Sequence, residues 1–313
     1  MSRLLTGDEV WCPYTDRNIP YEHCTPEHII PLAFGGCDQL TVPVEGRANS
    51  LLGHEIDGAL SKDLGMQIRR REFSALGHSG KIPQAIARVA SYGDDRRPAQ
   101  IQFNGKKPMR IWDAKDRRDL SEEEAVGQRI SFKLHLNMIA RVRFVAKVML
   151  SAGYYVYGDC FRRHADHDAA RRFMNVRKFH DLEVAVDQCM ARGNWDSFPR
   201  QKWWDVDDSV NQALCKRTNG SAVIMVPLAD NSLLVSVGLL GAWIGSMTIP
   251  VDVEKFPLDD EHDLGHVTAV IEGQVQRHSY RQYVTSGFPE LLSDLALPIA
   301  DNHHLKDNDG SRV

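Results

Sequence analysis

The stretch from residue 21 to 57 constrains the fold more than any other part of the chain. Glu27-His28 stands at the end of a short apolar-flanked strand, and Gly35-Gly36 lets the backbone turn sharply. Residues 40–44 alternate enough to form a second strand. Asn49-Ser50 is a good helix N-cap, and the apolar residues of one helical face then recur every fourth position, at Leu52, Ile56 and Leu60. The expected order is strand, glycine-rich loop, strand, helix.

These residues resemble the HNH endonuclease family, which is built on the ββα-metal motif. The resemblance rests on Glu27-His28-Ile29-Ile30-Pro31, on Gly35-Gly36, and on an Asn-x-x-x-Gly-x-x-Ile-Asp pattern formed by Asn49, Gly53, Ile56 and Asp57. It is specific over this stretch and much weaker over the rest of the chain. It implies an α+β protein with an N-terminal ββα-metal HNH motif, which we expect to be followed by central helices and a strand-rich C-terminal region.

The resemblance also implies roles for individual residues. His28 would be the general base, Glu27 the first metal ligand, Asn49 or Asp57 the second, and His54 an alternative ligand. Histidine titrates near neutral pH and so can take a proton from water. A divalent ion offsets the negative charge of a phosphodiester and stabilises the departing oxygen. Because oxygen ligands favour hard cations, the expected cofactor is one Mg²⁺ or Mn²⁺.

Two features depart from the family pattern. The central Asn of the family has no clear counterpart, so Asp38 or Thr41 is expected to hold the loop. Many members also carry two Cys-x-x-Cys pairs that bind a structural zinc, whereas only Cys12 matches here. A substitute site would have to be built from Cys24, Cys37 and His23. Free thiols are the simpler expectation, and we do not expect structural zinc.

The charge distribution by itself fits a solvated surface of alternating charge, and it favours a nucleic-acid partner only together with the neighbouring motif, whose resemblance implies a phosphodiester substrate. The net charge is only −4, but residues 61–120 hold 14 Lys+Arg against 7 Asp+Glu, while residues 251–313 hold 5 against 12. A basic segment directly after the motif could lie along a phosphate backbone. Residues 101–112 are expected to form a hairpin around Gly105. The candidate phosphate contacts are Arg69, Arg70, Arg71, Lys106 and Lys107.

The centre of the chain has the longest helical pattern. Ser121 followed by three glutamates predicts a helix start, and the pattern continues over residues 121–152 to a stop at Gly153. Its apolar stripe predicts a core helix, with Arg141, Arg143 and Lys147 on the solvated face. A second, weaker metal cluster is suggested beyond it by His164 and His167 with Asp166, Asp168 and Cys160. The alternative is a basic, solvated helix whose arginines (Arg162, Arg163, Arg171 and Arg172) help to hold nucleic acid.

The expected division of the chain has five parts: the HNH motif (1–65), a basic, loop-rich segment facing nucleic acid (66–120), a helical region (121–200), a strand-rich domain (201–300) and a disordered tail (301–313). The strand-rich domain is expected to be an antiparallel sheet. No apolar run reaches the length of a membrane span, no signal-peptide pattern opens the chain, and six scattered cysteines suit reduced thiols, so we expect a cytoplasmic protein.

The expected function is a metal-dependent endonuclease that cuts DNA in preference to RNA, within a restriction or anti-phage defence system. The expected partners besides DNA are a second copy of the chain or proteins of the same system. An alternative from another class is a nucleic-acid-binding protein that keeps a degenerate HNH scaffold without cutting.

Overall fold

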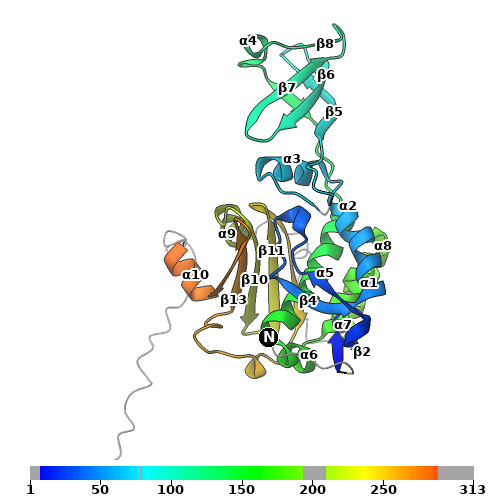
Figure 1. Ribbon diagram of the computed structural model, residues 1–313, viewed down its shortest axis with the longest axis vertical. Helices are drawn as coiled ribbons and strands as arrows, with labels where there is room; N and C mark the ends of the chain where they lie inside the picture. Colours follow the sequence, from blue (N-terminus) through cyan, green and yellow to red (C-terminus); the bar gives the residue numbers. More distant parts are fainter. Residues whose placement is uncertain (1–7, 78, 193–208, 288–313) are drawn as a thin grey trace, which may run out of the picture.

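The structure is a computed structural model and describes residues 8–77, 79–192 and 209–287 (Figure 1). Helices and strands are both abundant in these residues, which confirms the α+β class. Within the same ranges, no helix has the length and apolar character needed to cross a membrane. The tail expected at residues 301–313 lies outside the described residues.

The N-terminal elements follow the expected order of strand, loop, strand and helix. After a hairpin of β1 (Glu9–Cys12) and β2 (Arg17–Pro20) and the turn η1 (Tyr21–His23), β3 (Cys24–His28) pairs antiparallel with β4 (Thr41–Glu45). The loop between β3 and β4 contains η2 (Leu32–Phe34). A helical run then follows in three parts: α1 (Gly46–Leu52), the π-helical turn η3 (Gly53–Asp57) and α2 (Gly58–Leu60).

The helix begins earlier than the sequence pattern predicted. Glu45 occupies the N-cap position, and Asn49 lies inside α1, so the prediction of Asn49 as the cap was wrong. The predicted apolar face is nevertheless buried, with Leu52, Ile56 and Leu60 between 0% and 6% exposed.

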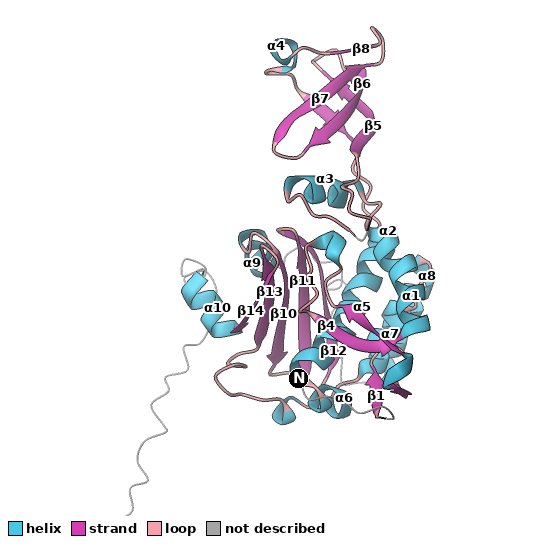
Figure 2. Ribbon diagram, viewed as in Figure 1, coloured by secondary structure: helices cyan, strands magenta, loops and turns pink. Residues whose placement is uncertain are grey.

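A five-stranded antiparallel sheet, which we call the head (residues 85–132), follows α3 (Leu64–Glu72). Its elements are β5 (Ala85–Tyr92), β6 (Arg97–Asn104), β7 (Lys107–Asp113), β8 (Arg118–Asp119), α4 (Glu122–Ala125) and β9 (Ile130–Phe132), and its strand order is β8-β7-β6-β5-β9. Figure 2 shows the head standing apart from the other elements, beyond α3. The loop-rich segment expected at 66–120 is therefore largely a sheet, whose central hairpin, β6–β7, contains the hairpin predicted at 101–112.

The long helix expected at 121–152 is divided. Ser121 does form a capping box with Glu124, but α4 ends at Ala125, and Gly127 takes a positive φ of 76°. Residues 130–132 then join the head as β9, because they pair with β5. The long helix α5 (Met138–Tyr157) starts only after Asn137, whose side chain accepts a hydrogen bond from the backbone N–H of Ala140.

The C-terminal part consists of helices and a second antiparallel sheet. The helices are α6 (Asp159–His164), α7 (His167–Met174), α8 (Phe179–Arg192), α9 (Ser209–Arg217) and α10 (Tyr280–Gly287). The sheet has the order β12-β11-β10-β13-β14, from β10 (Ser221–Leu228), β11 (Ser232–Leu239), β12 (Ala242–Pro250), β13 (His266–Ile271) and β14 (Gln274–Ser279), with η5 (Val253–Lys255) after β12. This confirms the predicted antiparallel sheet.

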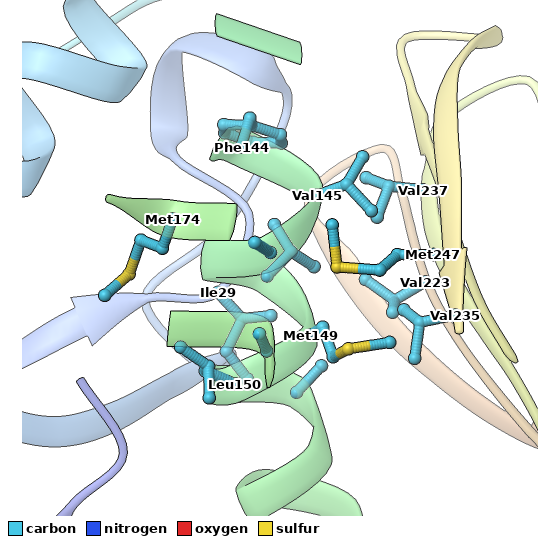
Figure 3. Packing of buried hydrophobic residues seen from close by; sticks show 14 of the residues in the cluster. Ile29, Phe144, Val145, Met149, Leu150, Met174, Val223, Val235, Val237 and Met247 are labelled. Atoms are coloured by element: carbon cyan, nitrogen blue, oxygen red, sulfur yellow. The ribbon is translucent and has the colours of Figure 1, made fainter. Parts of the chain in front are cut away.

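Helix α5 joins the N-terminal motif and the C-terminal sheet into one core. Every residue from 143 to 153 is buried, as expected for a helix surrounded by protein on all sides. Figure 3 shows its apolar side chains between Ile29 of the motif and the sheet residues Val223, Val235, Val237 and Met247. The predicted solvated face was wrong, because Arg143 and Lys147 point into this core, 6% and 2% exposed.

Candidate active site

The Gly-Gly loop is held in one conformation by local geometry and by the C-terminal sheet. Gly35 has a φ of +81°, and a Cβ on Gly36 would lie 1.6 Å from the carbonyl oxygen of Ile30, so both positions require glycine. The buried Ser221 hydroxyl donates to the Phe34 carbonyl (2.6 Å) and accepts from the Leu240 N–H (2.8 Å). Sheet and loop are thereby fixed to each other.

His28 stands at the end of β3, where the loop brings Asp38 beside it. The His28 Nε2 lies 2.8 Å from Asp38 Oδ1, and the two side chains are 17% and 90% exposed. Of the two residues expected to hold the loop, Asp38 is thus placed to orient the imidazole, while Thr41 pairs with His28 through the strand register. When Asp38 accepts the Nε2 proton, the ring is held in one orientation and in the tautomer with Nδ1 unprotonated.

Glu27 points to the opposite side of β3, into the core, because neighbouring strand residues alternate in direction. Its Oε1 lies 2.6 Å from Lys147 Nζ and accepts a hydrogen bond from the Tyr14 hydroxyl at 3.2 Å. Asp57 Oδ2 lies 2.6 Å from the same Nζ. Two of the predicted ligands, Glu27 and Asp57, are therefore brought together, but around a lysine of α5.

Lys147 stays charged between the buried Glu27 and the half-buried Asp57. Burial alone lowers the pKa of Lys147, but attraction to Asp57 and Glu27 outweighs burial and leaves that pKa raised. Burial raises the pKa of Asp57 to about 6; Lys147 opposes this rise and Glu27 adds to it. Burial and the charge of Glu27 raise the pKa of Tyr14 well above its usual range. Lys147 therefore remains an ammonium throughout the neutral range.

The arrangement does not fit a divalent ion between Glu27 and Asp57. Two carboxylates are suitable ligands for Mg²⁺ or Mn²⁺, but the Lys147 ammonium already contacts both of them. Asp57 Oδ1 is buried and makes no hydrogen bond within the described part of the chain, so one carboxylate oxygen stays unsatisfied. A metal ion at this point would require Lys147 to leave.

The other two predicted ligands lie on the helical run. The Asn49 amide nitrogen donates to Thr25 Oγ1 (3.0 Å) and to the Pro26 carbonyl (3.3 Å), which fastens α1 to β3 and leaves the amide oxygen as its acceptor. His54 is exposed on η3. Within the ranges that the structure describes, neither His54 nor Glu27 belongs to a group of three His, Cys, Asp or Glu side chains with metal-ligand spacing.

A group with such spacing does occur elsewhere, at Asp16, His167 and Asp168. A guanidinium nitrogen of Arg171 lies at its centre, 3.2 Å from Asp16, 2.5 Å from Asp168 and 2.6 Å from His167 Nδ1. Of the second cluster predicted from the sequence, His167 and Asp168 meet, whereas the Cys160 thiol donates to the Lys255 carbonyl at 3.1 Å. Asp166 instead accepts from the Ala169 N–H at the start of α7, and His164 lies at the end of α6.

The five predicted phosphate contacts differ in exposure. Lys106 and Lys107 are exposed at the β6–β7 turn. Arg69 is 36% exposed and pairs with Glu72 at 2.9 Å, and Arg71 donates to the Pro83 carbonyl at 3.0 Å. Arg70 is 7% exposed, and burial lowers its pKa, so it is not part of a phosphate-facing surface.

The thiols considered for a zinc site contact backbone groups. Cys12 Sγ accepts from the Glu45 N–H at 3.4 Å, and Cys24 Sγ donates to the Pro20 carbonyl at 3.6 Å. Cys12 is buried, and Cys24 and Cys37 are half-buried.

Lys147 and Tyr14 are the site residues that the sequence did not reveal. One signal was available: residues 144–152 are apolar except for Lys147 and Ser151, which stand four apart on one helical face. A polar pair of that spacing in an otherwise apolar helix indicates a buried polar contact.

Comparison of the chain with protein-family models, with curated proteins and with solved structures gives no significant match.

Proposed function

We propose that this chain is an HNH-type endonuclease that hydrolyses DNA phosphodiester bonds with His28 as the general base. The observation that carries the proposal is the His28–Asp38 contact of 2.8 Å at the end of a strand, within the strand–loop–strand–helix order. Asp38 would hold the imidazole ring and stabilise its charged form after His28 takes a proton from water. The exposed Lys106 and Lys107 would contact the phosphate backbone.

The family resemblance implies Mg²⁺ or Mn²⁺, which would offset phosphate charge. Lys147 holds both Glu27 and Asp57, so these carboxylates do not supply a ready site for such an ion. The steps that the chain itself supports are proton transfer at His28, orientation of the ring by Asp38, and electrostatic attraction of the substrate by the head. A role in restriction or anti-phage defence is part of the same proposal.

A second candidate is a nucleic-acid-binding protein that does not cut. The observation that favours it is Lys147, whose ammonium contacts both carboxylates that would otherwise serve as metal ligands. This candidate keeps the basic head and the strand–loop–strand–helix frame but assigns Glu27 and Asp57 a purely structural role.

Plasmid cleavage separates the two candidates. Purified wild-type protein, the variant His28→Ala and the control His180→Ala, at an exposed position outside the site, would be incubated with supercoiled plasmid in Mg²⁺, Mn²⁺ or EDTA. The nuclease proposal expects metal-dependent nicking that is absent in His28→Ala and kept in His180→Ala. Salt-sensitive plasmid binding without nicking by any of the three proteins would favour the non-cutting candidate.

A further inference from the structure

The head presents one closed and one open face. On the closed face, Tyr92, Ala99 and Ile111 are buried in a small core. On the open face lies a pocket of about 320 Å³ lined by Ile86, Gln100, Gln102, Arg110, Trp112 and Asp119. The pocket therefore lies on the solvent-facing side of the sheet, away from the α5 core and from the strand of His28.

The strand register explains why these six side chains share one face. Gln100 of β6 pairs with Trp112 of β7, and Gln102 pairs with Arg110. Trp112 in turn pairs with Asp119 of β8, and Gln102 with Ile86 of β5. Directly paired residues point to the same side of a sheet, so four strands contribute to one polar surface around a tryptophan.

The chemistry of the pocket suits a flat, uncharged group with polar edges. Trp112 is half-buried and offers an aromatic surface. Arg110 Nε donates to Asp119 Oδ1 at 2.7 Å, and a second Arg110 nitrogen contacts Oδ2, so the two charges cancel and the guanidinium is fixed. Each glutamine amide supplies both a donor and an acceptor. Nucleobases have this combination of a flat face and a donor–acceptor edge.

Charge along the same hairpin provides the complement to a phosphate backbone. The hairpin, residues 97–113, holds 4 Lys+Arg against 1 Asp+Glu. Lys106 and Lys107 are exposed at the tip of the β6–β7 hairpin, where Lys107 pairs with Asn104, two residues beyond Gln102. A strand residue advances the chain by about 3.3 Å, so Lys107 lies roughly 7 Å along the strand from Gln102, within reach of one nucleic-acid strand.

We propose that the pocket around Trp112 binds one unpaired base of a single-stranded nucleic acid, with the backbone continuing toward Lys106 and Lys107. A base stacked within a duplex has both faces covered and cannot lie on an indole ring, so the pocket selects single strands or unpaired positions. This binding mode rests on the nucleic-acid partner of the proposed function, but it does not require cleavage.

Binding of fluorescent oligonucleotides to the full-length protein in EDTA tests this proposal. The probes are a mixed-sequence single-stranded DNA 12-mer, its RNA equivalent and the matching DNA duplex, followed by anisotropy. Trp112→Ala is expected to weaken single-strand binding about tenfold or more, because the variant cannot stack a base. Trp112→Phe should keep most of the affinity, and Met109→Ala, exposed on the same strand but with the opposite side-chain direction, should keep all of it.

An abasic series gives a readout that does not depend on the folding of a variant. Single-stranded probes that each lack one base are compared on the wild-type protein and on Trp112→Ala. The proposal expects at least one position at which the missing base weakens wild-type binding, with no such position in Trp112→Ala. Equal affinity of wild type and Trp112→Ala, an equal weakening for duplex and single strand, or no single-strand binding by the wild type would each overturn it.

The two proposals fail separately. Nicking is compared between the wild type and His28→Ala in Mg²⁺, and single-strand binding between the wild type and Trp112→Ala in EDTA, where no cleavage occurs. If the wild type nicks plasmid and Trp112→Ala binds single strands as tightly as the wild type, the nuclease proposal stands and the base-binding proposal is wrong. If single-strand binding depends on Trp112 but the wild type does not nick plasmid, the base-binding proposal stands and the nuclease proposal is wrong.

Discussion

At the residue scale, Lys147 supplies the positive charge that balances the two carboxylates of the candidate site. Its ammonium lies 2.6 Å from both Glu27 and Asp57 and is 2% exposed. Removing one partner from a buried ion pair leaves uncompensated charge, which costs far more than removing one partner of an exposed pair. The stability of the folded protein therefore depends on Lys147, whether or not the site is catalytic.

Replacing Lys147 with methionine should lower the free energy of unfolding by about 3–5 kcal/mol, because the buried carboxylate of Glu27 and the half-buried one of Asp57 would be left without a cation. Urea unfolding at neutral pH measures the change. The control Lys216→Met, at an exposed position of α9, should change little. If Glu27 and Asp57 can bind a divalent ion once Lys147 is gone, Mn²⁺ will raise the midpoint of the variant and leave that of the wild type unchanged. A decrease below about 1 kcal/mol would contradict the role given to Lys147.

His266 makes the stability of the C-terminal sheet dependent on acid. The residue is fully buried, its Nδ1 donates to the Glu261 carbonyl (3.2 Å), and its Nε2 accepts from the Thr268 hydroxyl (3.1 Å). Burial lowers the pKa of His266 to about 4, below the ordinary value of 6.5. Between these values the unfolded chain binds the extra proton and the folded one does not, so stability falls as the pH falls from 6.5 to 4.

The expected contribution of His266 is a decrease in stability of about 3 kcal/mol over that interval. Unfolding free energies of the wild type and of His266→Gln, measured from about pH 7 to pH 4, would give the difference. The variant should show a shallower decline, whereas His180→Gln, at an exposed position, should decline as the wild type does. Parallel curves for wild type and His266→Gln would rule out this assignment.

At the element scale, α5 is the central helix that packs against both the N-terminal motif and the C-terminal sheet. The motif packs on one side of it and the C-terminal sheet on the other (Figure 3). Gly153 lies within the helix, where a Cβ would approach Phe161 of α6 to 2.4 Å. The glycine that looked like a helix stop is therefore a packing position that lets α6 approach α5.

Gly153→Ala should accordingly destabilise the protein by about 1–3 kcal/mol through overpacking, despite the better helix propensity of alanine. Gly58→Ala is a matched control, since Gly58 is also helical and a Cβ there would meet only an ordinary contact at 3.8 Å. That control should be neutral or slightly stabilising. Thermal unfolding would compare the two, and a stabilised Gly153→Ala variant would mean that α6 does not pack as described.

Local sequence patterns predicted individual strands, loops and helices well, but they predicted the contacts between distant elements less well. The sequence predicted the Gly-Gly loop, the paired strands and the apolar face of Leu52, Ile56 and Leu60, because each of these depends on residues close in sequence. The direction of Lys147 was not, because it depends on Glu27, 120 positions earlier in the chain. The helix expected to run from Ser121 was broken because residues 130–132 pair with β5, a contact that local propensity does not contain.

At the scale of the whole molecule, the head, with Lys106 and Lys107 at its hairpin tip, and the charged trio of Glu27, Asp57 and Lys147 are separate parts. Figure 1 shows the head beyond α3, while β4 and α2 pack against α5, which in turn packs against β11 and β12 of the C-terminal sheet. Binding and chemistry can therefore be altered independently. Substitutions in the head should change the salt dependence of DNA binding, and substitutions at His28 should change the rate of cleavage.

Duplex DNA binding should weaken with salt, because phosphate contacts release bound counterions. The double variant Lys106→Gln/Lys107→Gln should lower the slope of log affinity against log salt by about 2, one for each lysine that no longer neutralises a phosphate. The control Lys255→Gln, in the acidic C-terminal part, should leave the slope unchanged. A slope that is the same in all three proteins would mean that the hairpin tip does not bind phosphate.

The most direct test of the central claim is the plasmid nicking rate of the wild type, Asp38→Asn and His28→Ala in Mg²⁺. We predict a graded result: nicking by the wild type, nicking slowed about 10- to 100-fold when Asp38 no longer stabilises the imidazolium, and none without His28. Equal rates for wild type and His28→Ala, or no nicking by the wild type in Mg²⁺ or Mn²⁺, would contradict it.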